Sequence, residues 1–142
     1  MAFEEKRAWI MAVVSTVTYA TYLIIVLGRL GDASVADVRY AALLLWTVGL
    51  SIAAQILLNV LTDVLSAEGS RHKDTRDHEI HRFSQFVAQG AVVAGGVAAM
   101  VLALAEADYF WIANVLYLAF TISGLIGSVA KIVTYRTGLP SW

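Results

Sequence analysis

Four apolar stretches, each about 20 residues long or longer, limit the folds open to this sequence. They cover approximately residues 8–27, 40–61, 83–104 and 109–133, and none carries a charge near its centre. A helix rises 1.5 Å per residue, so about 20 residues cross a hydrocarbon core about 30 Å thick. Lipid offers the backbone no hydrogen bonds, so each stretch must be helical. We predict an all-α membrane protein with four transmembrane helices in a single domain, residues 1–142.

Composition supports this class and excludes others. Of the 142 residues, 59% are hydrophobic and 15% are charged, whereas a soluble domain has about 45–50% apolar and about 25% charged residues. The net charge is −1, and the largest group of basic residues has acidic residues among it in the sequence. We therefore expect the lipid bilayer and no nucleic acid as a partner. Cysteine is absent, which excludes disulfide, iron–sulfur and thiol chemistry.

The placement of Lys and Arg predicts the orientation. Four spans put both termini and the middle loop, about residues 66–82, on one side. Eight of the ten Lys and Arg residues lie on that side: Lys6, Arg7, Arg71, Lys73, Arg76, Arg82, Lys131 and Arg136. Because basic loops stay in the cytoplasm, we predict cytoplasmic termini in the inner (plasma) membrane of a prokaryote.

The loops predict two antiparallel hairpins, with the third helix extended into the cytoplasm. The loops after the first and third spans are short, which makes each pair of spans a hairpin. Asp74 is a good N-cap for the third helix, and Asp77 completes a pattern similar to a capping box. A helix over residues 74–104 is about 46 Å long, so about three turns lie outside the hydrocarbon.

The hydrophilic segment before the third span holds a candidate metal site. Asp74, Asp77, His78 and His81 are spaced three and four apart and share one helix face. Imidazole and carboxylate in this arrangement can bind a divalent ion such as Zn²⁺, Mn²⁺ or Fe²⁺, which a second chain could help to ligate. Helix capping, surface ion pairs and proton sensing are the alternatives for the same residues.

A second candidate site is an intramembrane polar cluster. Gln55, Asn59 and Asp63 recur every four residues on the second span, and Gln85 and Gln89 do so on the third. Polar groups at lipid depth usually face the bundle interior. We expect the two spans to be neighbours and the cluster to lie below the histidines. It could bind an ion or a small polar ligand, or fix helix packing by hydrogen bonds.

Small residues mark close helix contacts. One row, on the third span, consists of Ala91, Gly95, Ala99 and Ala103. Such rows let helix backbones approach closely, either within the chain or in a homodimer or higher oligomer. Lys131, near the end of the fourth span, is expected to reach the cytoplasmic headgroups.

The segment from Lys73 to Ile80 reads K-D-T-R-D-H-E-I. It resembles the K-D-E-R-D-x-x-I segment of small, uncharacterised prokaryotic membrane proteins, from which it differs at Thr75. The resemblance covers about ten residues and the hydropathy pattern. It implies short paired spans on either side of the segment and carries no activity with it.

Three classes of function remain open. We favour an integral membrane binding or regulatory protein whose Asp/His cluster binds a divalent metal or a partner. The alternatives are a small oligomeric transporter or channel for an ion or polar solute, and a metal-dependent membrane enzyme. A non-enzymatic role is preferred, because the sequence shows neither a nucleophile nor a full ligand set.

The predicted orientation is testable with topology reporters. A reporter fused after Trp142 should behave as cytoplasmic, and one inserted near Ser34 as external, because of the uneven placement of Lys and Arg. External activity of the fusion after Trp142 would overturn the orientation.

Overall fold

The computed structural model describes residues 3–31, 40–65, 75–139 and 141, and their regular structure is helical. The four helices are α1 (Phe3–Leu30), α2 (Ala41–Leu65), α3 (Thr75–Leu104) and α4 (Tyr109–Thr137). All four are long and apolar enough to cross a membrane. The predicted all-α class with four long apolar helices is therefore confirmed, and the chain is a multi-pass membrane protein.

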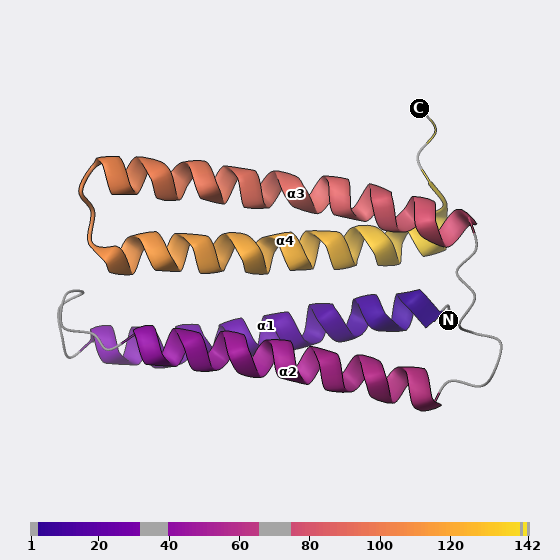
Figure 1. Cartoon of the computed structure of the whole chain (residues 1–142), viewed down its shortest axis with the longest axis horizontal. Helices are drawn as coiled ribbons and strands as arrows, with labels where there is room; N and C mark the ends of the chain where they lie inside the picture. Colours follow the sequence, from indigo (N-terminus) through magenta and orange to yellow (C-terminus); the bar gives the residue numbers. More distant parts are fainter. Residues whose placement is uncertain (1–2, 32–39, 66–74, 140, 142) are drawn as a thin grey trace.

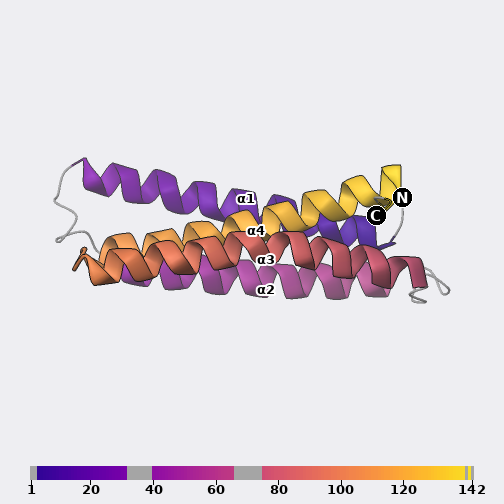
Figure 2. The same ribbon diagram turned by 90° about the horizontal axis from the view of Figure 1, so that it is seen from above.

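The helices lie side by side along one axis (Figures 1 and 2). In Figure 1 the chain reverses direction from each helix to the next, and the termini lie at the same end. We call this the terminal end. Extensive packing joins α3 to α4, α4 to α1, and α1 to α2. Within the described helices α2 and α3 share no comparable interface, so the expectation that these two spans are close neighbours is wrong. Residues 66–74 separate the two helices in sequence, so chain connectivity does not force them to pack.

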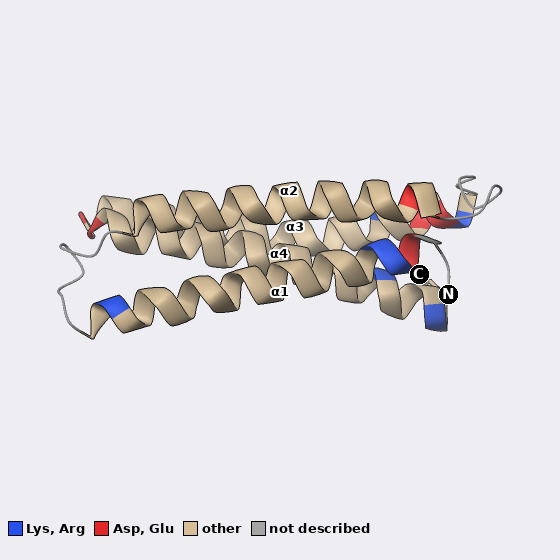
Figure 3. Ribbon diagram, turned by 90° about the horizontal axis from the view of Figure 1, so that it is seen from below, with Lys and Arg blue, Asp and Glu red and all other residues tan. Residues whose placement is uncertain are grey.

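The outer surface is suited to lipid. Large apolar side chains such as Ile24, Leu45 and Leu65 are exposed along the helices. Charged residues gather at the two ends of the bundle and leave its middle uncharged (Figure 3). Such a surface would be insoluble in water, but in a bilayer it faces hydrocarbon.

The closest helix contact lies between α3 and α4. A Cβ atom added at Gly95 would lie 2.0 Å from the Cβ of Ala119, so only glycine fits there. Ala88 and Ala99, on the same helix as Gly95, are also buried. Ser123 on α4 donates a hydrogen bond of 2.9 Å to the backbone oxygen of Ala88. The middle of the small-residue row on α3 thus serves packing within the chain.

Local signals set the ends of α4. Asp108 caps its start, with a carboxylate oxygen that accepts a hydrogen bond of 3.0 Å from the backbone N–H of Phe110. Gly138, with φ of 90°, ends it, because this backbone conformation is open mainly to glycine. The predicted cap of α3, Asp74, lies outside the described residues, and α3 begins at Thr75.

The contact at Gly95 gives a matched pair of substitutions. Gly95→Ala should lower the free energy of unfolding in detergent by roughly 1–3 kcal/mol, because its methyl group overlaps Ala119. Gly96→Ala adds the same methyl group where nothing lies within 4 Å, and it should be neutral or stabilising. Equal effects of the two substitutions would contradict the described contact.

Candidate functional site

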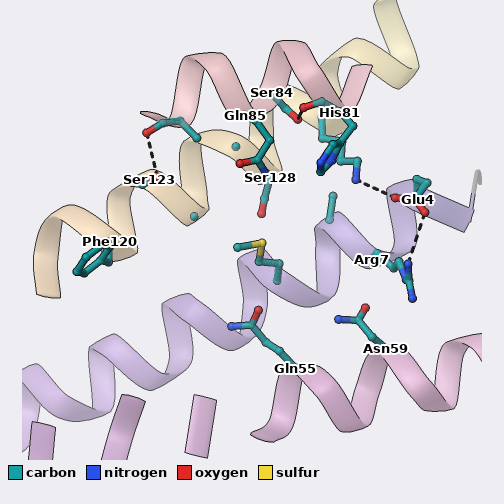
Figure 4. A pocket seen from close by; sticks show the side chains of 16 residues that line it. Glu4, Arg7, Gln55, Asn59, His81, Ser84, Gln85, Phe120, Ser123 and Ser128 are labelled. Carbon is teal, nitrogen blue, oxygen red and sulfur yellow. Dashed lines mark hydrogen bonds and ion pairs between the residues drawn. The ribbon is translucent and has the colours of Figure 1, made fainter. Parts of the chain in front are cut away.

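A pocket of about 420 Å³ lies toward the terminal end of the bundle, and all four helices contribute to its lining. Figure 4 shows it from close by. The character of the lining changes with distance from the terminal end. Charged side chains are followed by amides and hydroxyls, and then by apolar groups.

A chain of ion pairs stands at the charged end of the pocket. Lys131 Nζ lies 2.8 Å from Glu4 Oε2, and Arg7 Nη1 lies 3.6 Å from Glu4 Oε1. Arg7 Nη2 in turn donates to both carboxylate oxygens of Asp63, at 3.0 and 2.9 Å. These ion pairs link α4, α1 and α2 and contain two positive and two negative charges. The Glu4 side chain is only 8% exposed, and a carboxylate so buried requires such partners.

Lys131 is turned into the bundle, whereas the sequence predicted that it would point outward to the headgroups. Its side chain is 14% exposed and turned toward Glu4 on α1. The nearby acid accounts for the difference, because the ion pair with Glu4 holds the ammonium group inside the bundle.

The middle of the pocket is lined by amides and hydroxyls. In Figure 4, Gln55 and Asn59 extend from α2 into the pocket. They point toward the side where Gln85 of α3 and Ser128 of α4 lie. Gln55 donates to Ser51 Oγ at 3.3 Å. Ser128 is 2% exposed, and its hydroxyl has no hydrogen-bond partner among the described residues. The same holds, within the described part of the chain, for the buried Oδ1 atom of Asn59.

The end of the pocket farthest from the termini is mainly apolar on α1, α3 and α4. Met11 on α1, Ala88 on α3 and Phe120 on α4 line it, together with Gly124. A Cβ atom at Gly124 would lie 3.4 Å from Met11 Cε, so the glycine leaves room for the methionine. Along α1 and α4 the pocket therefore passes from ionic to apolar surroundings, whereas α2, among the described residues, lines it with the amides of Gln55 and Asn59 only.

The structure brings together part of the predicted polar cluster. Gln55, Asn59 and Gln85 all line the pocket. Asp63 lies beside it and is bound to Arg7. Gln89 is exposed on α3 and is not among the lining residues.

The predicted metal residues do not assemble into a site within the described residues. Asp77 accepts a hydrogen bond from the hydroxyl of Tyr135 on α4. His78 and His81 are both exposed, and His81 also lines the pocket. Asp74 lies outside the described residues. Across the described ranges, no three His, Cys, Asp or Glu side chains are grouped so that they could hold a metal ion. The Asp/His prediction is therefore unsupported, since Asp77 is bonded to Tyr135 of α4 and no such group forms within the described ranges.

Sequence reasoning missed the residues that contribute most charge and polarity to the pocket. Arg7 entered only the count of basic residues that predicts the orientation, and neither Glu4 nor Ser128 was predicted to line a site. A signal was present on α4, where Gly124, Ser128 and Lys131 follow at spacings of four and three and so share one helix face. Nothing in the sequence indicated which acid Lys131 would meet.

Aromatic residues close the other half of the bundle. Tyr22 is fully buried and donates a hydrogen bond of 2.6 Å to Asn114 Oδ1. The rings of Tyr22 and Tyr19 each meet Tyr117 edge to face, with centroids 4.9 and 5.1 Å apart. Tyr117 donates to Thr47 Oγ1 at 3.3 Å. The buried polar groups thus continue beyond the pocket, but there they bond to one another.

No protein family, curated protein or solved structure matches the chain. Fold and site together define a helical multi-pass membrane protein with a polar pocket at one end.

The ion pairs give a test of the site's architecture. Lys131→Met should lower the free energy of unfolding in detergent by roughly 3 kcal/mol, because it leaves the buried Glu4 carboxylate without its closest cation. Adding Glu4→Gln to this variant should restore part of the loss, because no charge is then stranded. Additive losses in the double variant would show that the two groups are not coupled.

Proposed function

We propose that this chain is an integral membrane binding protein that takes a polar ligand into the pocket. The observation that carries the proposal is the pair of buried polar atoms, Ser128 Oγ and Asn59 Oδ1. Neither has a hydrogen-bond partner among the described residues. A buried polar atom without a partner costs about 1–3 kcal/mol, and a ligand that bonds to both atoms removes that cost.

The charge balance of the pocket favours a ligand of no net charge. The four members of the ion-pair chain cancel one another, and each acid already meets a base. A divalent cation would need several free carboxylates or neutral imidazoles as ligands, and the described lining adds only the imidazole of His81 to the paired acids. A neutral or zwitterionic ligand with hydrogen-bond donors matches the lining better.

In this proposal the chain lies in the inner membrane of a prokaryote as two antiparallel hairpins, with the termini and the charged end of the pocket toward the cytoplasm. The gathering of Lys and Arg at the terminal end supports that orientation (Figure 3). The start of α3 then extends beyond the hydrocarbon, which agrees with the charges in its first turns.

The absence of cysteine allows a direct test of the pocket. In right-side-out and inside-out membrane vesicles, a Ser128→Cys variant should react with a charged, membrane-impermeant maleimide from the cytoplasmic face. The reason is that its side chain opens into the polar pocket. The control is Thr47→Cys. Thr47 is similarly buried, but it lies in the half of the bundle that is closed by aromatic rings, where it bonds to Tyr117. This variant should react far more slowly. Equal rates for the two variants would argue against the pocket.

The bound ligand itself can be sought by native mass spectrometry of protein extracted from its own membranes. An adduct should be present on the wild-type chain and lost from Ser128→Leu, whose larger side chain fills the polar zone. Ser141→Leu, at an exposed position outside the helices, is the matched control and should keep the adduct. Absence of any adduct, together with an unreactive Ser128→Cys variant, would refute the binding function.

Transport is the second candidate function. It is favoured by the buried polar groups beyond the pocket, Asn114, Tyr22, Tyr117 and Thr47, whose two hydrogen bonds could open to extend the pocket across the bundle. The labelling experiment separates the two candidates. A binding protein exposes the Ser128→Cys thiol to one face only, whereas a transporter that alternates between two states exposes it to both faces.

A further inference from the structure

We propose that the ligand is a membrane phospholipid with a zwitterionic headgroup that carries N–H donors, as in phosphatidylethanolamine. The headgroup occupies the ionic and polar zones, and the hydrocarbon begins at the apolar zone. This inference rests on the proposed binding function and adds the chemical class of the ligand.

The gradient of the lining is the first argument. Along every helix of the pocket the lining residue closest to the terminal end is charged or polar: Glu4, Asn59, His81 and Lys131. Toward the middle of the bundle, α1, α3 and α4 contribute the apolar side chains of Met11, Ala88 and Phe120. The hydroxyl of Ser123 in this part is bonded to the backbone of α3, and α2 contributes the amide of Gln55. A water-soluble ligand would leave this apolar zone without a matching surface. An amphiphile matches both parts, and its direction agrees with that of a lipid in the same leaflet.

The second argument is access from the bilayer. Gln55 and Asn59 of α2 and Gln85 of α3 line the same pocket, although α2 and α3 share no extensive interface within the described helices. The pocket is therefore not shut off by helix packing on this side. A lipid can move in from its own leaflet while its acyl chains stay in hydrocarbon. Apolar side chains on these two helices, such as Ile56 and Phe86, are exposed to the acyl region.

The third argument concerns the headgroup. The Lys131 ammonium carries three N–H donors, of which Glu4 takes one, so it can also bind a phosphate oxygen. Asn59 Oδ1 is an acceptor without a partner among the described residues, so it requires a donor. A headgroup with an ammonium group two carbons from a phosphate offers both the N–H donor and the phosphate oxygen. The headgroup has no net charge, so the balanced ion pairs stay intact.

The experiment compares lipids with the same acyl chains. Wild-type protein is equilibrated with equimolar phosphatidylethanolamine, phosphatidylcholine and phosphatidylglycerol in mixed micelles, and bound lipid is counted by native mass spectrometry. Phosphatidylcholine has the same charge as phosphatidylethanolamine but no N–H donor. We expect phosphatidylethanolamine to exceed phosphatidylcholine roughly tenfold, the ratio produced by one hydrogen bond left unmade at a buried group. Equal binding of the two lipids overturns the inference.

Substitutions test which residue distinguishes phosphatidylethanolamine from phosphatidylcholine. Asn59→Leu should lose the preference for phosphatidylethanolamine over phosphatidylcholine, because it removes the acceptor. Gln89→Leu is the matched control, since it replaces an exposed amide that does not line the pocket; the preference should persist. An unchanged preference in Asn59→Leu overturns the assignment of the headgroup to this pocket. The lipid comparison in the wild type does not depend on whether any variant folds.

A soluble headgroup separates this inference from the proposed function. Glycerophosphoethanolamine has the same headgroup without acyl chains, and it should fail to displace the lipid at equal concentration. If it displaces the lipid fully, the pocket binds a polar solute and only the lipid inference fails. The inference alone also fails if no lipid is retained while the Ser128→Cys variant still reacts. If that variant is unreactive as well, the proposed function fails too.

Discussion

Within a bilayer, apolar side chains gain little by leaving lipid for one another, so the hydrophobic effect cannot hold these helices together. Three kinds of interaction remain: close approach of small residues, hydrogen bonds between helices, and ion pairs near the membrane surface. All three are present here. Gly95 meets Ala119, Ser123 bonds to the backbone of α3, and Glu4 joins Lys131.

The distribution of these interactions explains why the bundle is open where it is. The α3–α4 pair relies on small residues and packs most extensively. The α1–α4 contact is closed by aromatic rings in one half and by an ion pair at the terminal end. Between these two contacts lies the pocket, where Ser128 and Asn59 have polar atoms without a partner in the described part of the chain. Because interactions between these helices depend on so few polar groups, these two buried polar atoms call for an explanation.

The sequence predicted the helices well, because span length and hydropathy are properties of single segments. It also indicated Gln55, Asn59 and Gln85 as polar residues turned inward, since their spacing of four defines a helix face. Partners between segments were harder to predict. Helix periodicity groups Asp77 with His78 and His81, but only the packing of α4 turns Asp77 toward Tyr135. Likewise, Glu4 and Lys131 are 127 positions apart, and no local pattern links them.

The pairing of α1 with α4 has a consequence for the biogenesis of the protein. Glu4 and Glu5, at the start of α1, pair with Lys131 and Arg136 on α4, which is synthesised after the other three described helices. Until the ribosome has released α4, both carboxylates must remain hydrated at the membrane surface, and the pocket lacks one of its walls. The first hairpin can therefore insert into the membrane early, but the ion pairs of α1 with α4 form only later. The pocket is complete only in a chain that has been translated through its fourth span, because Ser128 and Lys131 both come from α4.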